Sequence, residues 1–223
     1  MMKRLMISTL CVASLAMAGC AGKVTQPDEY SGFLSDYSQL REAKSPSGAD
    51  VMRWVDPGLN LNSYKAVFIE PTQFYPRPQA TTKIPDSTLN GINAYYSQAL
   101  QRELAKSLPL ANAPGPGVIV VRAAITAVSS KTESLKPYEY IPVALVAAAV
   151  STGTGIRDQE TTLGTEAQFL DGASGKVLAQ VVRKGTGKPL SNDAQVMRAD
   201  DVKGVIDGWA QDLHQSYMKL KGR

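Results

Sequence analysis

The chain has 223 residues, of which 43% are hydrophobic, so it is long enough to bury a core of its own. Its formal net charge of +4 is weak. No basic run with interleaved aromatics appears, which argues against a nucleic-acid partner. Both cysteines, Cys11 and Cys20, lie near the start, which excludes thiol catalysis, thiolate metal sites and disulfides from the rest of the chain.

The first residues have the pattern of an export signal. Lys3 and Arg4 precede a short apolar run that ends in small residues, and Cys20 follows directly. A basic start, an apolar stretch and small residues before a cleavage point are the parts of a secretory signal. A cysteine at this place is typical of a bacterial lipoprotein. We expect residues 1–19 to be a signal peptide and Cys20 to be the lipidated first mature residue. The alternative is an ordinary signal peptide cut near Ala18.

The lipid on Cys20 predicts where the protein lies. One acyl chain holds a protein on a membrane only reversibly, whereas two or three chains on one residue give stable attachment. In many Gram-negative bacteria an Asp directly after the lipidated cysteine retains the protein at the inner membrane. This chain has Ala21 and then Gly22. The sequence therefore favours the outer membrane, with the protein on its periplasmic face.

Residues 20–60 are predicted to form a lipid-anchored tether, because they are rich in Gly, Pro, Ser and Asp. Within this tether Phe33, Leu34, Tyr37 and Leu40 have the spacing of one or two helical turns with an apolar face. That face either docks on the protein's own domain or lies on the bilayer or a partner. Phe33 and Tyr37 are therefore candidates for an interaction surface.

A periplasmic α/β domain is expected over residues 61–223. The apolar run 65–70 is typical of a buried strand. After a proline-rich loop, apolar residues recur every three or four positions from Leu89 to Leu104 and predict an amphipathic helix. The run 118–128 is mostly apolar on both faces, which predicts a central strand.

A second apolar run, residues 143–150, is too short to span a bilayer. One interpretation is a buried or half-buried helix that joins two strands. The other is an apolar surface that enters a membrane or a groove on a partner. Leu145 and Val146, at the centre of this run, are therefore further candidates for an interaction surface.

The rest of the chain predicts a hairpin and a helix. Residues 163–169 and 177–182 alternate in polarity around a turn at 171–175. An apolar stripe over 202–217, preceded by Asp200, predicts the last helix. The fold class is therefore α/β (α+β-like). We expect a small mixed or largely antiparallel sheet of about four strands, with two amphipathic helices on one face.

Three segments together resemble a known family. Residues 31–40 contain the string Gly-Phe-Leu-x-x-Tyr-x-x-Leu, residues 54–57 read Trp-Val-Asp-Pro with Tyr64 downstream, and residues 171–178 form the predicted hairpin turn. With the lipidation motif, these segments resemble bacterial lipoproteins of the domain-of-unknown-function 3313 family. The resemblance implies an exported lipoprotein, and it brings no catalytic residues with it.

The sequence offers no catalytic, cofactor-binding or metal-binding constellation. His214 is the only histidine, and we expect it to be a surface or boundary residue of the last helix. The glycine strings at 174–176 and 185–188 lack the full spacing of a phosphate-binding loop and are predicted to be turns. No cofactor is expected.

The function predicted from these observations is that of a non-enzymatic, outer-membrane-anchored periplasmic lipoprotein. It is expected to bind another cell-envelope protein as an accessory or assembly factor. The alternative is a module that binds peptidoglycan or a lipid, with Phe74, Tyr75, Tyr138 and Tyr140 as candidate lining aromatics.

Overall fold

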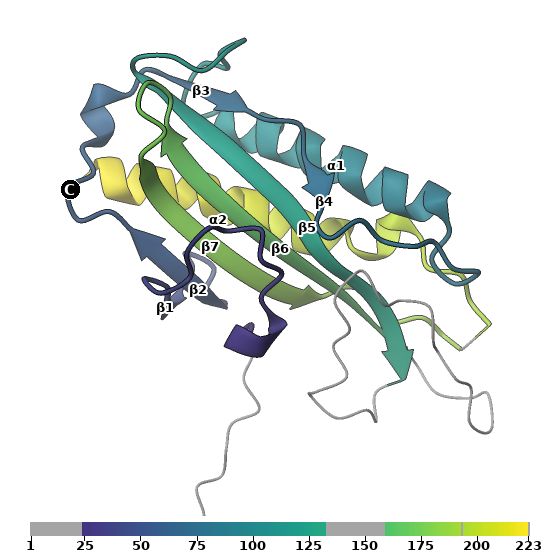
Figure 1. The fold of residues 1–223 in the computed structure, drawn as a ribbon. Helices are drawn as coiled ribbons and strands as arrows, with labels where there is room; N and C mark the ends of the chain where they lie inside the picture. Colours follow the sequence, from purple (N-terminus) through teal and green to yellow (C-terminus); the bar gives the residue numbers. More distant parts are fainter. Residues whose placement is uncertain (1–23, 133–158, 193, 223) are drawn as a thin grey trace, which may run out of the picture.

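The computed structural model describes residues 24–132, 159–192 and 194–222, which form one curved sheet backed by two helices (Figure 1). The strands are β1 (Arg41–Lys44), β2 (Asp50–Val55), β3 (Ala66–Ile69), β4 (Gln73–Phe74), β5 (Val118–Thr132), β6 (Gln159–Asp171) and β7 (Val177–Thr186). The helices are α1 (Asp86–Leu104) and α2 (Lys203–Lys221). Several residues named above lie outside the described ranges: Cys20, Tyr138, Tyr140, Leu145 and Val146.

The sheet is mixed, as predicted, but larger than predicted. Its strand order is β1-β2-β7-β6-β5-β3, and β4 also pairs with β5 to give seven strands. β3 and β4 run parallel to β5, and the other pairs are antiparallel. The estimate of about four strands was wrong because β1, β2 and β4 lie in segments that were interpreted as tether and loop.

The sheet starts well before residue 61. β2 pairs with β7 from Met52 opposite Val182 to Val55 opposite Ala179, and β1 adds the edge strand. The second half of the segment that was predicted to be a tether is therefore part of the folded sheet. β2 has charges at Asp50 and Arg53 among its six residues, and β1 carries three charges in four residues, so neither strand has a strong apolar signal.

Both helices cover the same face of the sheet, as the sequence predicted (Figure 1). Every position of the stripe predicted for α1 is buried, namely Leu89, Ile92, Tyr96, Leu100 and Leu104. In α2, Ile206 and Tyr217 are buried, and Trp209 packs against the core. Burial of each such side chain contributes about 1.5–3 kcal/mol, which is why periodicity predicted these helices well.

Close packing of α2 explains a glycine that the sequence placed in a loop. Gly185 belongs to β7, and a Cβ atom built there would come within 2.9 Å of Val205 and 3.0 Å of Trp209. The glycine therefore lets α2 approach the sheet. Residues 185–188 were predicted to form a turn. This prediction was wrong for Gly185 and Thr186, which belong to β7.

The opposite face of the sheet is partly covered by residues 24–40 (Figure 1). Leu34 and Leu40 are buried there with Val182. The segment docks on the protein's own domain, which was one of the two alternatives, but the helical turns predicted for residues 33–40 do not form. Turn chemistry explains the difference, because the carboxylate of Asp36 accepts a hydrogen bond from the Ser38 N–H and so competes with a helix.

Candidate ligand-binding site

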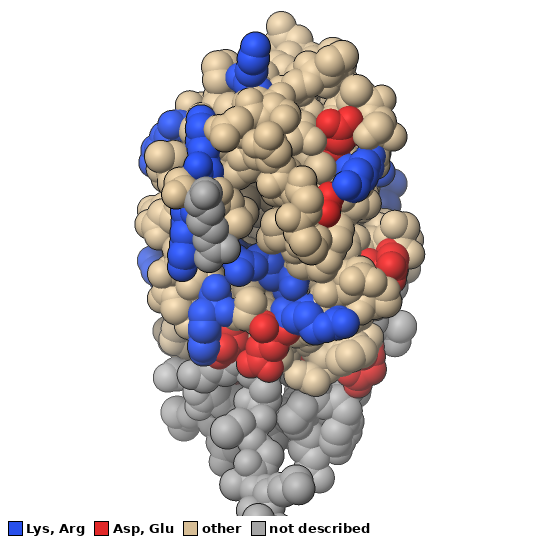
Figure 2. All heavy atoms as spheres, turned by 90° about the vertical axis from the view of Figure 1, so that its left-hand side faces the viewer, with Lys and Arg blue, Asp and Glu red and all other residues tan. Residues whose placement is uncertain are grey.

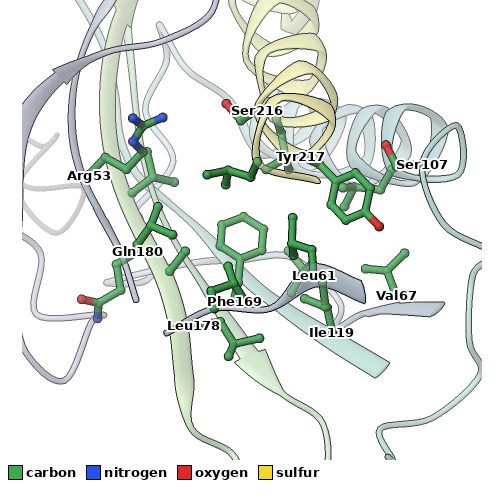
Figure 3. Close-up of a pocket in the computed structure, with 18 of the residues that line it drawn as sticks. Arg53, Leu61, Val67, Ser107, Ile119, Phe169, Leu178, Gln180, Ser216 and Tyr217 are labelled. Carbon is green, nitrogen blue, oxygen red and sulfur yellow. The ribbon is translucent and has the colours of Figure 1, made fainter. Parts of the chain in front are cut away.

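A cavity of about 100 Å³, partly open to solvent, lies between the sheet and the C-terminal half of α2 (Figure 3). Most of its lining is aliphatic or aromatic: Val55, Leu59, Leu61, Val67, Leu104, Leu108, Ile119, Val121, Phe169, Leu178, Ala179, Val181, Leu213, Tyr217 and Leu220. The polar lining residues are Arg53, Ser107, Gln180, Arg183 and Ser216. An apolar lining with a few polar groups is typical of sites for small organic ligands.

Strand register explains why space remains at this place. Phe169 of β6 lies opposite Val121 on one side and Ala179 on the other, and Ala179 in turn lies opposite Val55. Since directly opposite residues share a face of the sheet, these four side chains form one layer beneath α2. Ala179 contributes only a methyl group to that layer, which leaves room beside Phe169.

Arg53 is a charged residue in the helix-facing row of β2. It lies directly opposite Val181, which packs against the core under the helices, and its neighbours in the row are Val51 and Val55. Within the part of the chain that the structure describes, its half-buried side chain has no hydrogen bond or ion pair. Figure 3 places Arg53 at one side of the pocket.

Arg183, the second arginine at the pocket, is already paired. Its Nη1 lies 3.1 Å from Oδ2 of Asp212, and the two side chains are only 9% and 3% exposed. Burial lowers the pKa of the Arg183 guanidinium, and the carboxylate of Asp212 opposes that effect, while the positive charge of Arg53 adds to it. Asp212 also accepts hydrogen bonds from the N–H and hydroxyl of Ser47. The Asp212 carboxylate is therefore engaged by the Arg183 guanidinium and by Ser47.

Tyr217 contributes an unpaired polar group on the other side of the pocket. The residue is 8% exposed, and its hydroxyl has no hydrogen-bond partner among the described residues. In Figure 3 this hydroxyl lies toward Val67 and Ser107, away from Arg53. The pocket therefore has a guanidinium on one side and a phenol on the other.

The surface around this end of the molecule is visible in Figure 2, which views the left-hand side of Figure 1, where β2 and the C-terminal end of α2 lie. Lys and Arg side chains gather there beside a hollow. Arg41 of β1 lies directly opposite Arg53 of β2 in the sheet. Positively charged side chains therefore lie beside a hollow at this end of the molecule.

His214 is half-buried, in agreement with its predicted boundary position. Its Nδ1 lies 2.6 Å from the hydroxyl of Ser107, and this hydrogen bond joins α2 to the chain just beyond α1. A hydrolytic triad needs a carboxylate on the second imidazole nitrogen. No such contact occurs among the described residues, where the pair links α2 to the segment after α1.

The surface candidates of the N-terminal segment lie on the opposite face of the sheet from this pocket. The hydroxyl of Tyr37 donates to Glu166 at 2.6 Å, and the ring of Phe33 packs edge-on against Tyr75 at 5.6 Å between centroids. Phe74 packs against the core of the helix-covered face. The structure thus brings Phe33 and Tyr37 together with the sheet, and it brings neither to the pocket.

Sequence reasoning did not find Arg53, Tyr217 or the pocket itself. One signal was present, because Arg53 interrupts the alternate apolar positions Val51 and Val55. It was missed because the segment was interpreted as a tether. Across residues 24–132, 159–192 and 194–222, no group of three or more His, Cys, Asp or Glu side chains is placed to hold a metal ion. None of the helices in these ranges has the length and apolar character needed to cross a membrane.

Fold and site together define an α/β domain with an apolar, arginine-edged pocket under two helices. The chain belongs to the family described as "Protein of unknown function (DUF3313)", whose model matches residues 29–213. This confirms the resemblance noted from the sequence. The chain is also 40% identical over 206 residues to the uncharacterized lipoprotein YdcL of Escherichia coli K12, and the match covers 92% of each chain.

Two solved structures show a more distant likeness. A PelC dodecamer from Paraburkholderia phytofirmans is 15% identical with a TM-score of 0.38, and the match covers 73% of this chain and 96% of that one. Protein XCC0632 from Xanthomonas campestris is 12% identical with a TM-score of 0.40, and the match covers 75% and 91%. Likeness at this level carries no information about function.

Proposed function

We propose that this protein is a lipid-anchored lipoprotein of the bacterial cell envelope that binds an apolar ligand non-covalently in the pocket beneath α2. The observation that carries the proposal is the partly open, largely apolar cavity between Phe169 and Tyr217. Burial of ligand surface there would contribute about 25 cal/mol per Å². Water in the same space would meet few hydrogen-bonding groups.

The sequence left open whether such a module binds peptidoglycan or a lipid. The pocket favours a lipid. Sugar hydroxyls and peptide groups lose their hydration when they are buried, so they need several hydrogen-bonding partners. The lining offers few such groups, and Arg183 is already engaged with Asp212. A hydrocarbon chain needs none.

The anchor is supported by the motif that ends at Cys20 and by the relative that is named a lipoprotein. Ala21 and Gly22 after the cysteine favour the outer membrane and its periplasmic face. Replacing Cys20 by Ala is expected to leave an unprocessed precursor that takes up no labelled palmitate. Normal processing of that variant would contradict the anchor.

Dye binding tests the pocket directly. The chain from Ala21 onward contains every residue that the structure describes, and it would be titrated with a neutral naphthylamine dye whose fluorescence rises in apolar surroundings. Ala179→Leu fills the space beside Phe169, whereas Ala105→Leu changes an exposed alanine at the end of α1. We expect dye binding by the wild type and by Ala105→Leu, and its loss in Ala179→Leu.

Melting curves followed by circular dichroism show whether each variant is folded. Absence of dye binding by the folded wild-type protein would reject the pocket as a ligand site. Binding that survives in a folded Ala179→Leu variant would reject it as well, because the dye would then lie elsewhere.

An envelope-protein partner is the second proposal, and the apolar run at residues 143–150 is the observation that favours it. We expect Val146→Asp to abolish capture of a crosslinked envelope partner by the full-length lipoprotein while leaving its melting temperature unchanged. A variant that unfolds would instead mean that the run is core, and the partner surface would have to be sought elsewhere.

A further inference from the structure

We infer that the pocket takes a single-chain lipid with an anionic head group, and that Arg53 binds the head group. This inference rests on the proposed function and adds the charge and shape of the ligand. It is carried by an unpaired guanidinium at one side of an apolar cavity, as Figure 3 shows.

The position of Arg53 is unusual for a residue without a partner. Its cross-strand neighbour Val181 packs against the core, and Val51 in the same row is 2% exposed. Charged side chains rarely occupy such rows unless they are paired, because partial burial of a charge costs free energy. A ligand carboxylate or phosphate would supply the missing partner, since a guanidinium binds either one through two parallel hydrogen bonds.

The surrounding charges also favour an anion. Arg53 faces Arg41 directly across β1 and β2, and its positive charge acts on Arg183. Among the described residues, Arg41 donates only to the main-chain carbonyls of Ser38 and Leu40. Asp212 is fully engaged by Arg183 and Ser47. Like charges placed opposite each other destabilise a sheet, and an anion at Arg53 would offset that repulsion.

The rest of the pocket suits one hydrocarbon chain. Arg53 and Tyr217 lie on opposite sides of the cavity (Figure 3), so a chain that starts at the guanidinium would run past Phe169 toward the Tyr217 ring. A volume of about 100 Å³ accommodates part of one chain rather than the two chains of a membrane diacyl lipid. A fatty acid has this shape and this charge.

The test compares two ligands that differ only in the head group. Decanoate and decanol, both kept below their solubility and micelle limits, would be titrated against the dye-loaded chain from Ala21 onward. Isothermal calorimetry would then give each Kd without the dye. We expect decanoate to bind about tenfold more tightly than decanol, as an added charge-assisted hydrogen-bonded pair implies.

Variants of Arg53 separate charge from shape. Arg53→Met keeps an apolar stem and removes the charge, and we expect it to lose the preference for decanoate while decanol still binds. Arg53→Lys keeps the charge without the planar fork and should lie between the two. Arg77→Met removes an exposed arginine outside the pocket and should leave both Kd values unchanged.

The outcomes separate this inference from the proposed function. Equal binding of decanoate and decanol by the wild type, or a preference that survives in Arg53→Met, would overturn the anionic head group and leave the apolar pocket in place. Binding of neither ligand to the folded protein would reject both the inference and the pocket function.

Discussion

The hydroxyl of Tyr37 donates a 2.6 Å hydrogen bond to Oε2 of Glu166, a residue 129 positions later in the chain. The other carboxylate oxygen accepts a 2.8 Å hydrogen bond from the Ser31 N–H, and Glu166 is only 1% exposed. Two charge-assisted hydrogen bonds thus hold the segment before β1 on the sheet. The segment that follows the predicted lipid anchor is therefore fixed to the domain.

Tyr37→Phe removes one donor from a buried carboxylate. A hydrogen bond to a charged group contributes about 1.5–3 kcal/mol, and we expect a loss of that size in the free energy of unfolding measured with urea. Tyr75→Phe is the matched control, because Tyr75 is 39% exposed. An equal, small effect of both changes would mean that the bond to Glu166 contributes nothing measurable.

Tyrosine ionisation gives the domain an alkaline limit. Burial and then the hydrogen bond to Glu166 raise the pKa of Tyr37 to about 12, and burial with a hydrogen bond to Asp171 raises that of Tyr64 to about 12. The ordinary value for both groups is 10.0. Between these values the folded state holds more protons than the unfolded state, so stability falls as pH rises. Below pH 10 the contribution is fully present.

The measurement is urea unfolding at a series of pH values from 10 to 12, with tyrosinate absorbance as a second signal. We expect the free energy of unfolding to fall across this range in the wild type and to fall less steeply in the double variant Tyr37→Phe, Tyr64→Phe. Identical slopes for the two proteins would show that neither tyrosine is responsible.

Strong periodicity made much of the fold predictable. The stripe from Leu89 to Leu104 and the doubly apolar run of β5 each match a single secondary structure, and both were found where the sequence placed them. β2 was missed because its partner β7 is distant in the sequence, and β1 was missed with it because it pairs only with β2. Asp50 and Arg53 interrupt the apolar residues there, and the pairing with β7 that makes this segment a strand is not visible locally.

The candidate site was less predictable than the fold. Its walls come from β2, the segment after β2, β3, β5 to β7 and both helices, so no contiguous stretch of sequence carries its signature. Phe33 was singled out because it lies on a local apolar pattern, and the structure shows that this pattern packs against the protein's own surface. Turn-forming interactions at Asp36 then replaced the expected helical turns.

The buried pair of Arg183 and Asp212 predicts a large effect from a small change. Asp212→Asn leaves the guanidinium of Arg183 buried without a counter-charge, and removal of one partner of a buried pair costs about 3–5 kcal/mol. We expect a loss of that order in urea unfolding. Lys44→Met, which removes the exposed partner of the ion pair with Asp50, should cost less than about 1 kcal/mol.

A double variant distinguishes the lost pair from general disruption. Arg183→Met combined with Asp212→Leu replaces both charges by apolar groups, which is often neutral or stabilising. We expect it to recover most of the stability lost in Asp212→Asn. A double variant as unstable as the single one would show that the hydrogen bonds from Ser47, rather than the ion pair, hold this corner together.

The unpaired hydroxyl of Tyr217 makes an opposite prediction. A buried polar group without a partner costs about 1–3 kcal/mol, and this hydroxyl has none among the described residues. Tyr217→Phe removes the hydroxyl and keeps the ring that lines the pocket. We expect the free energy of unfolding to rise by up to about 1 kcal/mol, with decanol binding unchanged.

Tyr96→Phe is a suitable comparison. Burial raises the pKa of Tyr96, and a hydrogen bond with Thr165 opposes that effect. Loss of this hydrogen bond should destabilise the fold. A Tyr217→Phe variant as destabilised as Tyr96→Phe would mean that the hydroxyl has a partner in solution.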